Sequence, residues 1–466
     1  TPPKGILDVI KDIQSNFHPR VVRSANAPLL SELMPLQERP MENAIGIVVG
    51  NVQGYLAWTG NKNVAKTEST FLVCSGTAGI GKTRYGQELF GTLQSKLSPA
   101  AQEKGFDFSP CYYYMLLDFS NGVSLGLEEE KLSPEIILGL RLAYSYFIQG
   151  KYQEQFPEFR FKALNYFGYF TITNVIIAIR NDLGLQPDQE FFLFLHVDEY
   201  QLCLAGTKPP TEDGLSLFKE MMHRLGHFMS GATRPSIIQT FLSGTAQQEV
   251  TQSAKPTFYS FHFLSCPVLS LGARYNIMGH FAKQFQVPCR KWMPKMPIFH
   301  LLSDTGGLPH AVQFLLEEFF GRQLEKANTF FDDVENINKN IDRIFTEVAK
   351  VLDSCYSIPD FAREHQQLVH ALVLERDTHT ILNDCEEDTG KVLVQIPFFF
   401  LYLYNNVIRD IQDNLEFAFL MNWKSNREWK YFEQFIAEYE VYRTNLLVSH
   451  GYKTMTLGEI YQGAIG

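Results

Sequence analysis

Several features that define whole classes of protein are missing from this chain of 466 residues. No two of its 7 cysteines form a C-x-x-C pair, so the spacing of a zinc site does not occur. The best apolar run, residues 396–404, has only about half of the roughly 18 residues that a membrane helix needs. We therefore expect reduced, mostly buried thiols in an intracellular protein that does not enter a membrane.

The chain also has fewer basic than acidic residues. Acidic residues outnumber basic ones, 51 against 41, which gives a formal net charge of −10. A general electrostatic attraction to nucleic acid or to an anionic membrane is therefore not favoured, although a local basic patch remains compatible with this balance. Because 45% of the residues are apolar and low-complexity segments are absent, the chain is expected to be globular, with about two to four domains.

One short stretch organises the rest of the chain. Residues 76–83, GTAGIGKT, match the pattern G-x-x-x-x-G-K-[ST] at every fixed position. A β-rich apolar stretch precedes them and a helical pattern follows, which is the strand–loop–helix context of a phosphate-binding P-loop. The backbone N–H groups of such a loop converge on phosphates, and the helix N-terminus adds a favourable dipole. The alternative is a glycine-rich turn that opens an ordinary helix.

Each residue type in this loop has a chemical reason. Gly76, Gly79 and Gly81 remove Cβ atoms that would block the approach of phosphates. Lys82 would reach the β- and γ-phosphates, and Thr83 would place its hydroxyl on Mg²⁺. The candidate nucleotide-binding residues are Gly76, Thr77, Ala78, Gly79, Ile80, Gly81, Lys82, Thr83 and Arg84, with Arg39 and Pro309 from elsewhere in the chain.

An acidic pair ends a second apolar run. Residues 191–197 are almost continuously apolar, as in a parallel strand covered on both faces, and Asp198-Glu199 follows. Asp198 would help to hold Mg²⁺ as a Walker B aspartate. Glu199 would orient and deprotonate the attacking water, which favours hydrolysis over binding alone. Taken alone, such a run is more often a strand leaving the core, and the upstream P-loop favours the functional interpretation.

The pattern of elements predicts an α/β fold, a P-loop NTPase with an open parallel sheet of the additional-strand class. Strands are expected at 70–75, 111–119, 191–197, 236–242 and 258–264, with a helical insertion at 130–190. In this class an added strand lies in space between the P-loop strand and the acidic strand. Ser243 or Thr245 would then be a polar sensor that contacts the γ-phosphate or the water. A simple Ser-Gly-Thr turn is the alternative.

Smaller modules are expected beyond the sheet. A Gly-x-Pro sequence opens a helix at Pro309 and resembles the lid motif of STAND-type and AAA+ ATPases, where the proline contacts adenine. Arg39 is a second candidate for contact with the adenine. The equal alternative is that Arg39 is a solvated arginine in a loop. A strand–turn–strand pattern over 378–397 predicts a winged-helix module, or else a packing domain without DNA contact. The predicted domains are an N-terminal helical segment 1–50, the NTPase core 51–290, a helical lid 291–345, the winged-helix module 346–415 and a helical C-terminal segment 416–466 that starts a truncated effector domain.

Several stretches together resemble one family. They are CSGTAGIGKTRYGQEL, FLHVDEYQ, IIQTFLSGT, GGLPHAV and WKYFEQFIAEYEVYRTNLL with its closing EIYQGA. These stretches are similar to the NTPase module of Crinkler-type effectors and the related retrotransposon-hot-spot proteins, from roughly residue 30 to the C-terminus. The resemblance implies a STAND/AAA+-like ATPase coupled to a C-terminal effector, often a restriction-endonuclease-like nuclease. It also implies ATP rather than GTP.

The chain departs from that family at several points. The Asp…Glu-x-Lys core of the nuclease does not occur before Gly466, so we expect no nuclease activity. His310 stands where an arginine often follows the Gly-x-Pro, which leaves a lid arginine unassigned. No arginine finger is assigned either, because Arg84, Arg234 and Arg274 are better explained as structural ion pairs. Because the chain starts at Thr1 rather than Met, we expect a processed or truncated fragment.

Two hypotheses for function follow. The first is Mg²⁺-dependent ATP binding and hydrolysis that drives a conformational switch and controls a C-terminal effector module. Its catalytic candidates are Lys82, Glu199, Ser243 and Thr245, and its metal ligands are Thr83 and Asp198. The alternative is a nucleotide-gated scaffold that binds protein or DNA with negligible hydrolysis. A kinase is disfavoured by the glutamate that follows Asp198 and by the additional strand.

The same interpretation sets the expected partners and location. The cofactors are ATP and Mg²⁺. The partners are a nucleotide, further copies of the chain, and a protein or DNA that binds the C-terminal modules, with no membrane. The expected location is the cytoplasm or nucleus, which includes a secreted effector that acts inside host cells.

Overall fold

The computed structural model describes residues 5–20, 34–35, 37, 39–57, 69–76, 78–120, 122–126, 129, 132–203, 212–229, 235–245, 259–321, 331 and 334–356. The predicted hairpin at 378–397 and the segment 416–466 lie outside these residues. By contacts, the chain forms two compact units. The first comprises Thr1–Asn26, Arg39–Gly76 and Gly81–Cys266, and the second comprises Ala27–Glu38, Thr77–Ile80 and Pro267–Gly466.

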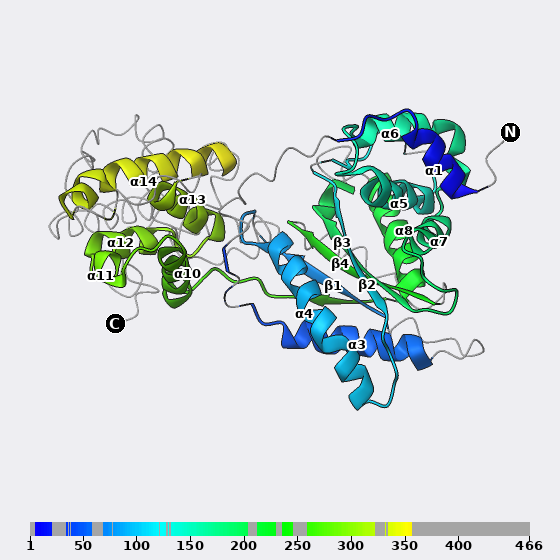
Figure 1. Ribbon diagram of the computed structural model, residues 1–466, viewed down its shortest axis with the longest axis horizontal. Coiled ribbons are helices and arrows are strands. Elements are labelled where there is room, and N and C mark those ends of the chain that lie inside the picture. The colour runs from blue at the N-terminus through cyan, green and yellow to red at the C-terminus, as the bar shows by residue number, and fades with distance from the viewer. Residues whose placement is uncertain are drawn as a thin grey trace, which may run out of the picture. The chain divides into compact units, whose positions relative to one another are not determined.

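A parallel sheet forms the centre of the first unit (Figure 1). Its strands are β1 (Thr70–Ser75), β2 (Cys111–Asp118), β3 (Phe191–Asp198), β4 (Ser236–Gly244) and β5 (Ser260–Phe263). Their order is β2-β3-β4-β1-β5, and every pairing is parallel. Strand β4 therefore lies between the P-loop strand and the acidic strand, which confirms the predicted additional-strand fold.

Helices cover both faces of this sheet. They are α1 (Ile6–Gln14), α3 (Glu42–Ala57), α4 (Lys82–Glu103), α5 (Pro134–Ala143), α6 (Phe156–Ala163), α7 (Ile172–Asp182) and α8 (Glu212–Met229), with short turns η3 (Tyr144–Ile148), η4 (Leu164–Tyr169) and η5 (Tyr200–Cys203). Figure 1 shows α3 and α4 along one face and α5, α7 and α8 along the other. The predicted helical insertion contains α5 to α7.

The alternation of side chains along the strands explains why both faces need cover. On β3, Phe194 packs against Phe90 of α4, whereas Leu193 and Leu195 belong to the core that contains α5, α7 and α8. Strands β3 and β4 are buried along their whole lengths. Apolar residues at nearly every position of β3 are what a strand with two covered faces requires.

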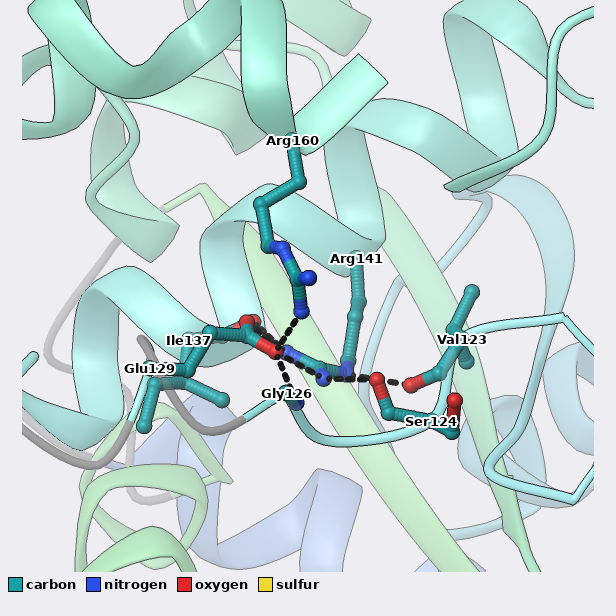
Figure 2. Close-up of polar contacts among 7 residues, drawn as sticks. All are labelled: Val123, Ser124, Gly126, Glu129, Ile137, Arg141 and Arg160. Atoms are coloured by element: carbon teal, nitrogen blue, oxygen red, sulfur yellow. Dashed lines mark hydrogen bonds and ion pairs between the residues drawn. The ribbon is translucent and has the colours of Figure 1, made fainter. Parts of the chain in front are cut away.

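A buried ion pair fixes the segment that follows β2 (Figure 2). Neither Glu129 nor Arg141 is exposed, and their atoms meet at 2.7 and 2.9 Å. Arg160 adds a third contact, from Nη1 to Glu129 Oε2 at 3.0 Å. Further hydrogen bonds join this cluster to the backbone of Val123, Ser124, Gly126 and Ile137. Burial would raise the pKa of Glu129, but the hydrogen bonds and charge of Arg141 outweigh it, so the pKa is lowered.

The described part of the second unit is helical. It contains α10 (Leu271–Gln284), α11 (Cys289–Trp292), α12 (Met296–Asp304), α13 (Pro309–Phe320) and α14 (Val334–Tyr356). Helix α13 begins with a proline at its first position, where the missing N–H is not needed. Helix α14 runs through the predicted boundary between residues 345 and 346. Among the described helices, none has the combination of length and apolar composition that a membrane crossing requires.

Among the residues that the structure describes, no cysteine forms a disulfide. Cys74, Cys203 and Cys266 are buried, Cys111 is half-buried, and Cys289 and Cys355 are exposed. The expectation of buried thiols therefore holds for the cysteines of the sheet and its connections, and not for the two exposed ones in the second unit.

Candidate nucleotide-binding site

The glycines of the P-loop have backbone angles that other residues avoid. The φ angles are +147° at Gly76, +73° at Gly79 and +94° at Gly81, all in the region that favours glycine. Gly81 is the N-cap of α4, and the first turn of that helix carries no acidic residue. The N-terminus of α4 therefore offers a favourable dipole for an anion, and its own first turn adds no negative charge.

The two residues that start α4 contact the rest of the candidate site. The buried Lys82 donates from Nζ to the carbonyl oxygen of Gly76, at 3.0 Å. Its ammonium therefore lies at Gly76, the first residue of the P-loop motif. Thr83 donates from Oγ1 to Asp198 Oδ2, at 2.6 Å. The end of β3 and the start of α4 thus meet through the two predicted metal ligands.

Beyond Asp198 the polar contacts continue into the core. Ser243, at the end of β4, donates its hydroxyl to Asp198 Oδ1. His196 Nε2 lies 2.6 Å from the same Ser243 oxygen, and Tyr114 of β2 lies 2.8 Å from His196 Nδ1. Burial lowers the pKa of His196 to about 4, against the opposing effect of Asp198 and Asp118. The imidazole is therefore neutral at physiological pH.

Glu199 is held by a neighbouring amide. Its φ angle of +52° is unusual for a residue other than glycine. Gln201 donates from Nε2 to Glu199 Oε2, and its own Oε1 accepts from the backbone N–H of Thr245, at 3.1 Å. Gln201 thus bridges the ends of β3 and β4. Of the two predicted sensors, Ser243 contacts Asp198 through its hydroxyl, whereas Thr245 contributes its backbone amide to the Gln201 bridge.

The segment of Arg39 contacts helix α4. Tyr85 of α4 donates its hydroxyl to the carbonyl oxygen of Pro40, at 2.7 Å. A hydrogen bond from Cys74, and then the charges of Arg39 and Lys82, lower the pKa of the Cys266 thiol against the effect of burial. Both cations therefore lie within electrostatic reach of this one buried thiol.

The other predicted ligands have different surroundings. Arg84 forms an ion pair with Glu88 on the same helix, at 2.7 Å. A structural ion pair was the expected alternative for this arginine. Arg274 likewise donates to the carbonyl oxygens of Leu302 and Ser303. Pro309 starts α13 in the second unit, where the next residue, His310, donates its backbone N–H to the carbonyl of Gly79, at 3.3 Å. Ala78 is exposed and Ile80 is buried, and Thr77 lies outside the described residues.

The pair formed by Thr83 and Asp198 fits a magnesium ion. Both supply hard oxygen ligands, and the two oxygen atoms are 2.6 Å apart. Within the described residues, no cluster of three or more His, Cys, Asp or Glu could hold a metal alone. Magnesium is usually bound through one or two protein side chains together with phosphates. The donor set therefore suits a Mg²⁺–nucleotide complex rather than a separate metal centre.

Three contributors to the site were not predicted from the sequence, namely His196, Gln201 and Tyr114. A signal existed for the first, because His196 interrupts the apolar run of β3 and shares a face with Asp198 two residues later. Gln201 lies in an adjacent turn, and its role depends on the position of β4. Tyr114 belongs to the aromatic run of β2, whose pairing with β3 brings it beside His196.

Comparisons with known proteins find only weak similarity to solved structures. No protein-family model matches the chain, and no curated protein matches its sequence. A Walker-type ATPase of Pyrococcus abyssi is similar at 13% identity and a TM-score of 0.41, over 79% of this chain and 93% of that one. The ORC1 protein of Aeropyrum pernix, in complex with DNA, has 11% identity and a TM-score of 0.36, over 89% of this chain and 85% of that one.

A third solved structure, Cdc6p from Pyrobaculum aerophilum, has 12% identity and a TM-score of 0.31, over 82% of this chain and 87% of that one. Likenesses of this size carry no argument about function. The fold assignment rests on this chain's own strand order and glycine loop, which are those of a P-loop NTPase with the additional strand.

Proposed function

We propose that this protein binds ATP with Mg²⁺ at the P-loop and hydrolyses it, and that this cycle drives a conformational switch. The contact between Thr83 and Asp198 carries the proposal. These residues are 115 positions apart in the sequence, and yet their side-chain oxygens lie within 2.6 Å. The two metal ligands expected from separate motifs therefore converge beside a glycine loop, which chance resemblance of either motif alone would not produce.

Different residues would contact the metal, the phosphates and the base of the nucleotide. Thr83 and Asp198 would hold Mg²⁺, which when bound neutralises charge on the phosphates. Lys82 would contact the β- and γ-phosphates, to which the N–H groups of the loop and of the first turn of α4 would donate. Arg39, and Pro309 at the start of α13, are proposed to contact the base.

Hydrolysis is assigned to Glu199. A carboxylate next to the metal-binding Asp198 can accept a proton from water that attacks the γ-phosphate. Ser243 and Thr245 are proposed to support this step from the end of β4, Ser243 through its hydrogen bond to Asp198 and Thr245 through the Gln201 bridge to Glu199. We expect slow turnover if a neighbouring subunit must supply an arginine.

A nucleotide-gated scaffold with negligible hydrolysis is the second candidate. The hydrogen bond from Gln201 to Glu199 favours it, because the carboxylate oxygen that accepts from the amide is already engaged and not aimed at a water. In this case the protein would bind ATP or ADP and present a surface for protein or DNA.

The finer assignments rest on the sequence resemblance. We propose a STAND/AAA+-like ATPase of the Crinkler type, with ATP preferred to GTP, a lid near 291–345 and a C-terminal effector that the switch controls. The domain boundaries, the winged-helix module at 346–415 and the homo-oligomeric, protein or DNA partners belong to the same proposal.

Phosphate release from ATP with Mg²⁺ tests the proposal. The wild type is compared with Glu199→Gln, and with Glu103→Gln as a control on an exposed carboxylate at the end of α4. We expect Glu199→Gln to lower the rate by about 10²- to 10⁴-fold, with ATP binding kept, and Glu103→Gln to leave it unchanged. Binding without release in all three proteins supports the scaffold, and neither binding nor release in the wild type refutes both candidates.

A further inference from the structure

A line of hydrogen bonds runs from Asp198 into the core of the first unit. Ser243 contacts Asp198, His196 lies 2.6 Å from Ser243, and Tyr114 lies 2.8 Å from His196. The residues come from β3, β4 and β2, which are neighbours in the sheet. His196 and Ser243 have no exposed surface, so no bulk water competes for these contacts.

The chemistry of the groups fixes the direction of these bonds. An ionised carboxylate only accepts, so the Ser243 hydroxyl must donate its single proton to Asp198. The Ser243 oxygen can then only accept from His196, which requires a proton on Nε2. On the other side of the ring, Nδ1 lies 2.8 Å from the hydroxyl of Tyr114, which completes the line of hydrogen bonds. The Ser243 hydroxyl and the Nε2–H of His196 therefore both point towards Asp198.

A glycine on α4 makes room for the imidazole of His196. A Cβ atom on Gly86 of α4 would lie 2.6 Å from both Cε1 and Nδ1 of His196, and 2.9 Å from the ring of Phe241. The rings of His196 and Phe241 meet edge to face, with centroids 4.7 Å apart. Helix α4 thus carries a glycine where the imidazole occupies the space of a side chain.

The two carboxylate oxygens of Asp198 accept hydrogen bonds from different donors. Oδ1 accepts from Ser243 and from the backbone N–H of Glu199, at 3.1 Å. Oδ2 accepts from Thr83. A rotation of the carboxylate would break the contacts of Oδ1, so Oδ2 is kept facing the start of α4, where the metal and the phosphates would be bound.

We propose that His196 and Tyr114 are positioning residues, which orient the Ser243 hydroxyl so that Asp198 presents Oδ2 to a nucleotide-bound Mg²⁺. The proposal rests on the proposed function for its metal, and on the first unit alone for its geometry. It assigns Ser243 to the orientation of Asp198 rather than to contact with the γ-phosphate.

The first test compares two tyrosines of the same strand. Tyr114→Phe removes the hydroxyl that meets His196, whereas Tyr112→Phe removes a hydroxyl that meets Ser98, at 2.8 Å. In a titration with a fluorescent ATP analogue, we expect Tyr114→Phe to raise the half-saturating Mg²⁺ concentration about three- to tenfold, with binding in EDTA unchanged. Tyr112→Phe should leave both values at those of the wild type.

A second test distinguishes polarity from packing at His196. His196→Gln can still donate to Ser243 and accept from Tyr114, whereas His196→Phe can do neither. We expect the glutamine variant to stay within about threefold of the wild-type Mg²⁺ requirement and the phenylalanine variant to exceed tenfold. Equal losses in both variants would show a packing role and overturn the proposal.

A third measurement needs no nucleotide. In ¹⁵N spectra of the histidine side chains, with His196→Gln used for assignment, we expect the imidazole of His196 to carry its proton on Nε2. A proton on Nδ1 alone would overturn the proposal.

If the wild type binds nucleotide with Mg²⁺ but Tyr114→Phe titrates as Tyr112→Phe does, this inference fails and the proposed function stands. If the wild type binds no nucleotide, the proposed function fails, and the ¹⁵N result decides the hydrogen-bond direction alone.

Discussion

Glu129 and Arg141 meet through two hydrogen bonds, at 2.7 and 2.9 Å, and neither side chain is exposed to solvent (Figure 2). The guanidinium also lies 5.0 Å from the ring centre of Phe119 and 4.8 Å from that of Phe156. Removing Arg141 leaves the fully buried carboxylate of Glu129 without its two shortest ion-pair contacts and with the single described contact from Arg160. The pair is therefore a determinant of how the segment after β2 packs on α5.

Replacement of Arg141 should strongly destabilise the first unit. We expect Arg141→Met to lower the free energy of unfolding by about 3–5 kcal/mol. The double variant Glu129→Leu/Arg141→Met should recover part of that loss, because it removes both fully buried charges and takes a contact only from the partly buried Arg160. Urea unfolding measures both, with the exposed Lys96→Met on α4 as the control. Additive effects of the two substitutions would contradict a direct interaction.

The same pair predicts how stability depends on pH. The pKa of Glu129 is lowered in the folded protein, so the carboxylate contributes stability that is complete above its unfolded pKa of about 4.3. That contribution is lost as the pH falls through the lowered pKa. We expect the difference in unfolding free energy between the wild type and Glu129→Gln to be constant from about pH 7 to 5 and to shrink below pH 4. A difference that grew on acidification would refute this assignment.

Gly139 allows α5 to approach the segment before α7. A Cβ atom there would lie 1.9 Å from the carbonyl oxygen of Phe170, a backbone atom that cannot turn aside. We expect Gly139→Ala to lower the free energy of unfolding by about 2 kcal/mol or more. Gly91 on α4 has open space around it, so Gly91→Ala should be neutral or stabilise by up to about 1 kcal/mol. Thermal unfolding of Gly139→Ala and Gly91→Ala, measured beside the wild type, checks both predictions.

Gly86 gives an independent prediction about the site. An alanine there would push on His196, and so disturb the hydrogen bond to Ser243. We expect Gly86→Ala to raise the Mg²⁺ requirement of nucleotide binding about tenfold, in the same direction as His196→Phe. Gly91→Ala, on the same helix, is the matched control. An unchanged Mg²⁺ titration in a folded Gly86→Ala protein would show that the position of His196 does not affect the metal ligands.

The sequence was sufficient for the parts of the fold that depend on local pattern. The glycines before Lys82 and the apolar run before Asp198 placed the P-loop and the acidic strand, and the sheet order confirms the additional strand between them. These signals are local because a phosphate loop needs particular backbone angles and a doubly covered strand needs apolar residues throughout.

Other features needed the assembled sheet. The contact between Gln201 and Thr245 joins two strand ends that are 44 residues apart, and no spacing rule predicts it. Tyr114 acts on His196 only because β2 pairs with β3 in one particular register. The buried Glu129 and Arg141 were not predicted either, since charged residues in a helical insertion are usually on its surface.

Nucleotide binding by Lys82→Ala tests the central claim most directly. Titration of a fluorescent ATP analogue with Mg²⁺ compares the wild type with this variant and with Lys96→Ala, which removes an exposed lysine from the same helix. The account predicts that Lys96→Ala binds as the wild type does and that Lys82→Ala loses about 10- to 150-fold in affinity. Equal affinity in the two lysine variants would contradict a P-loop that binds phosphate.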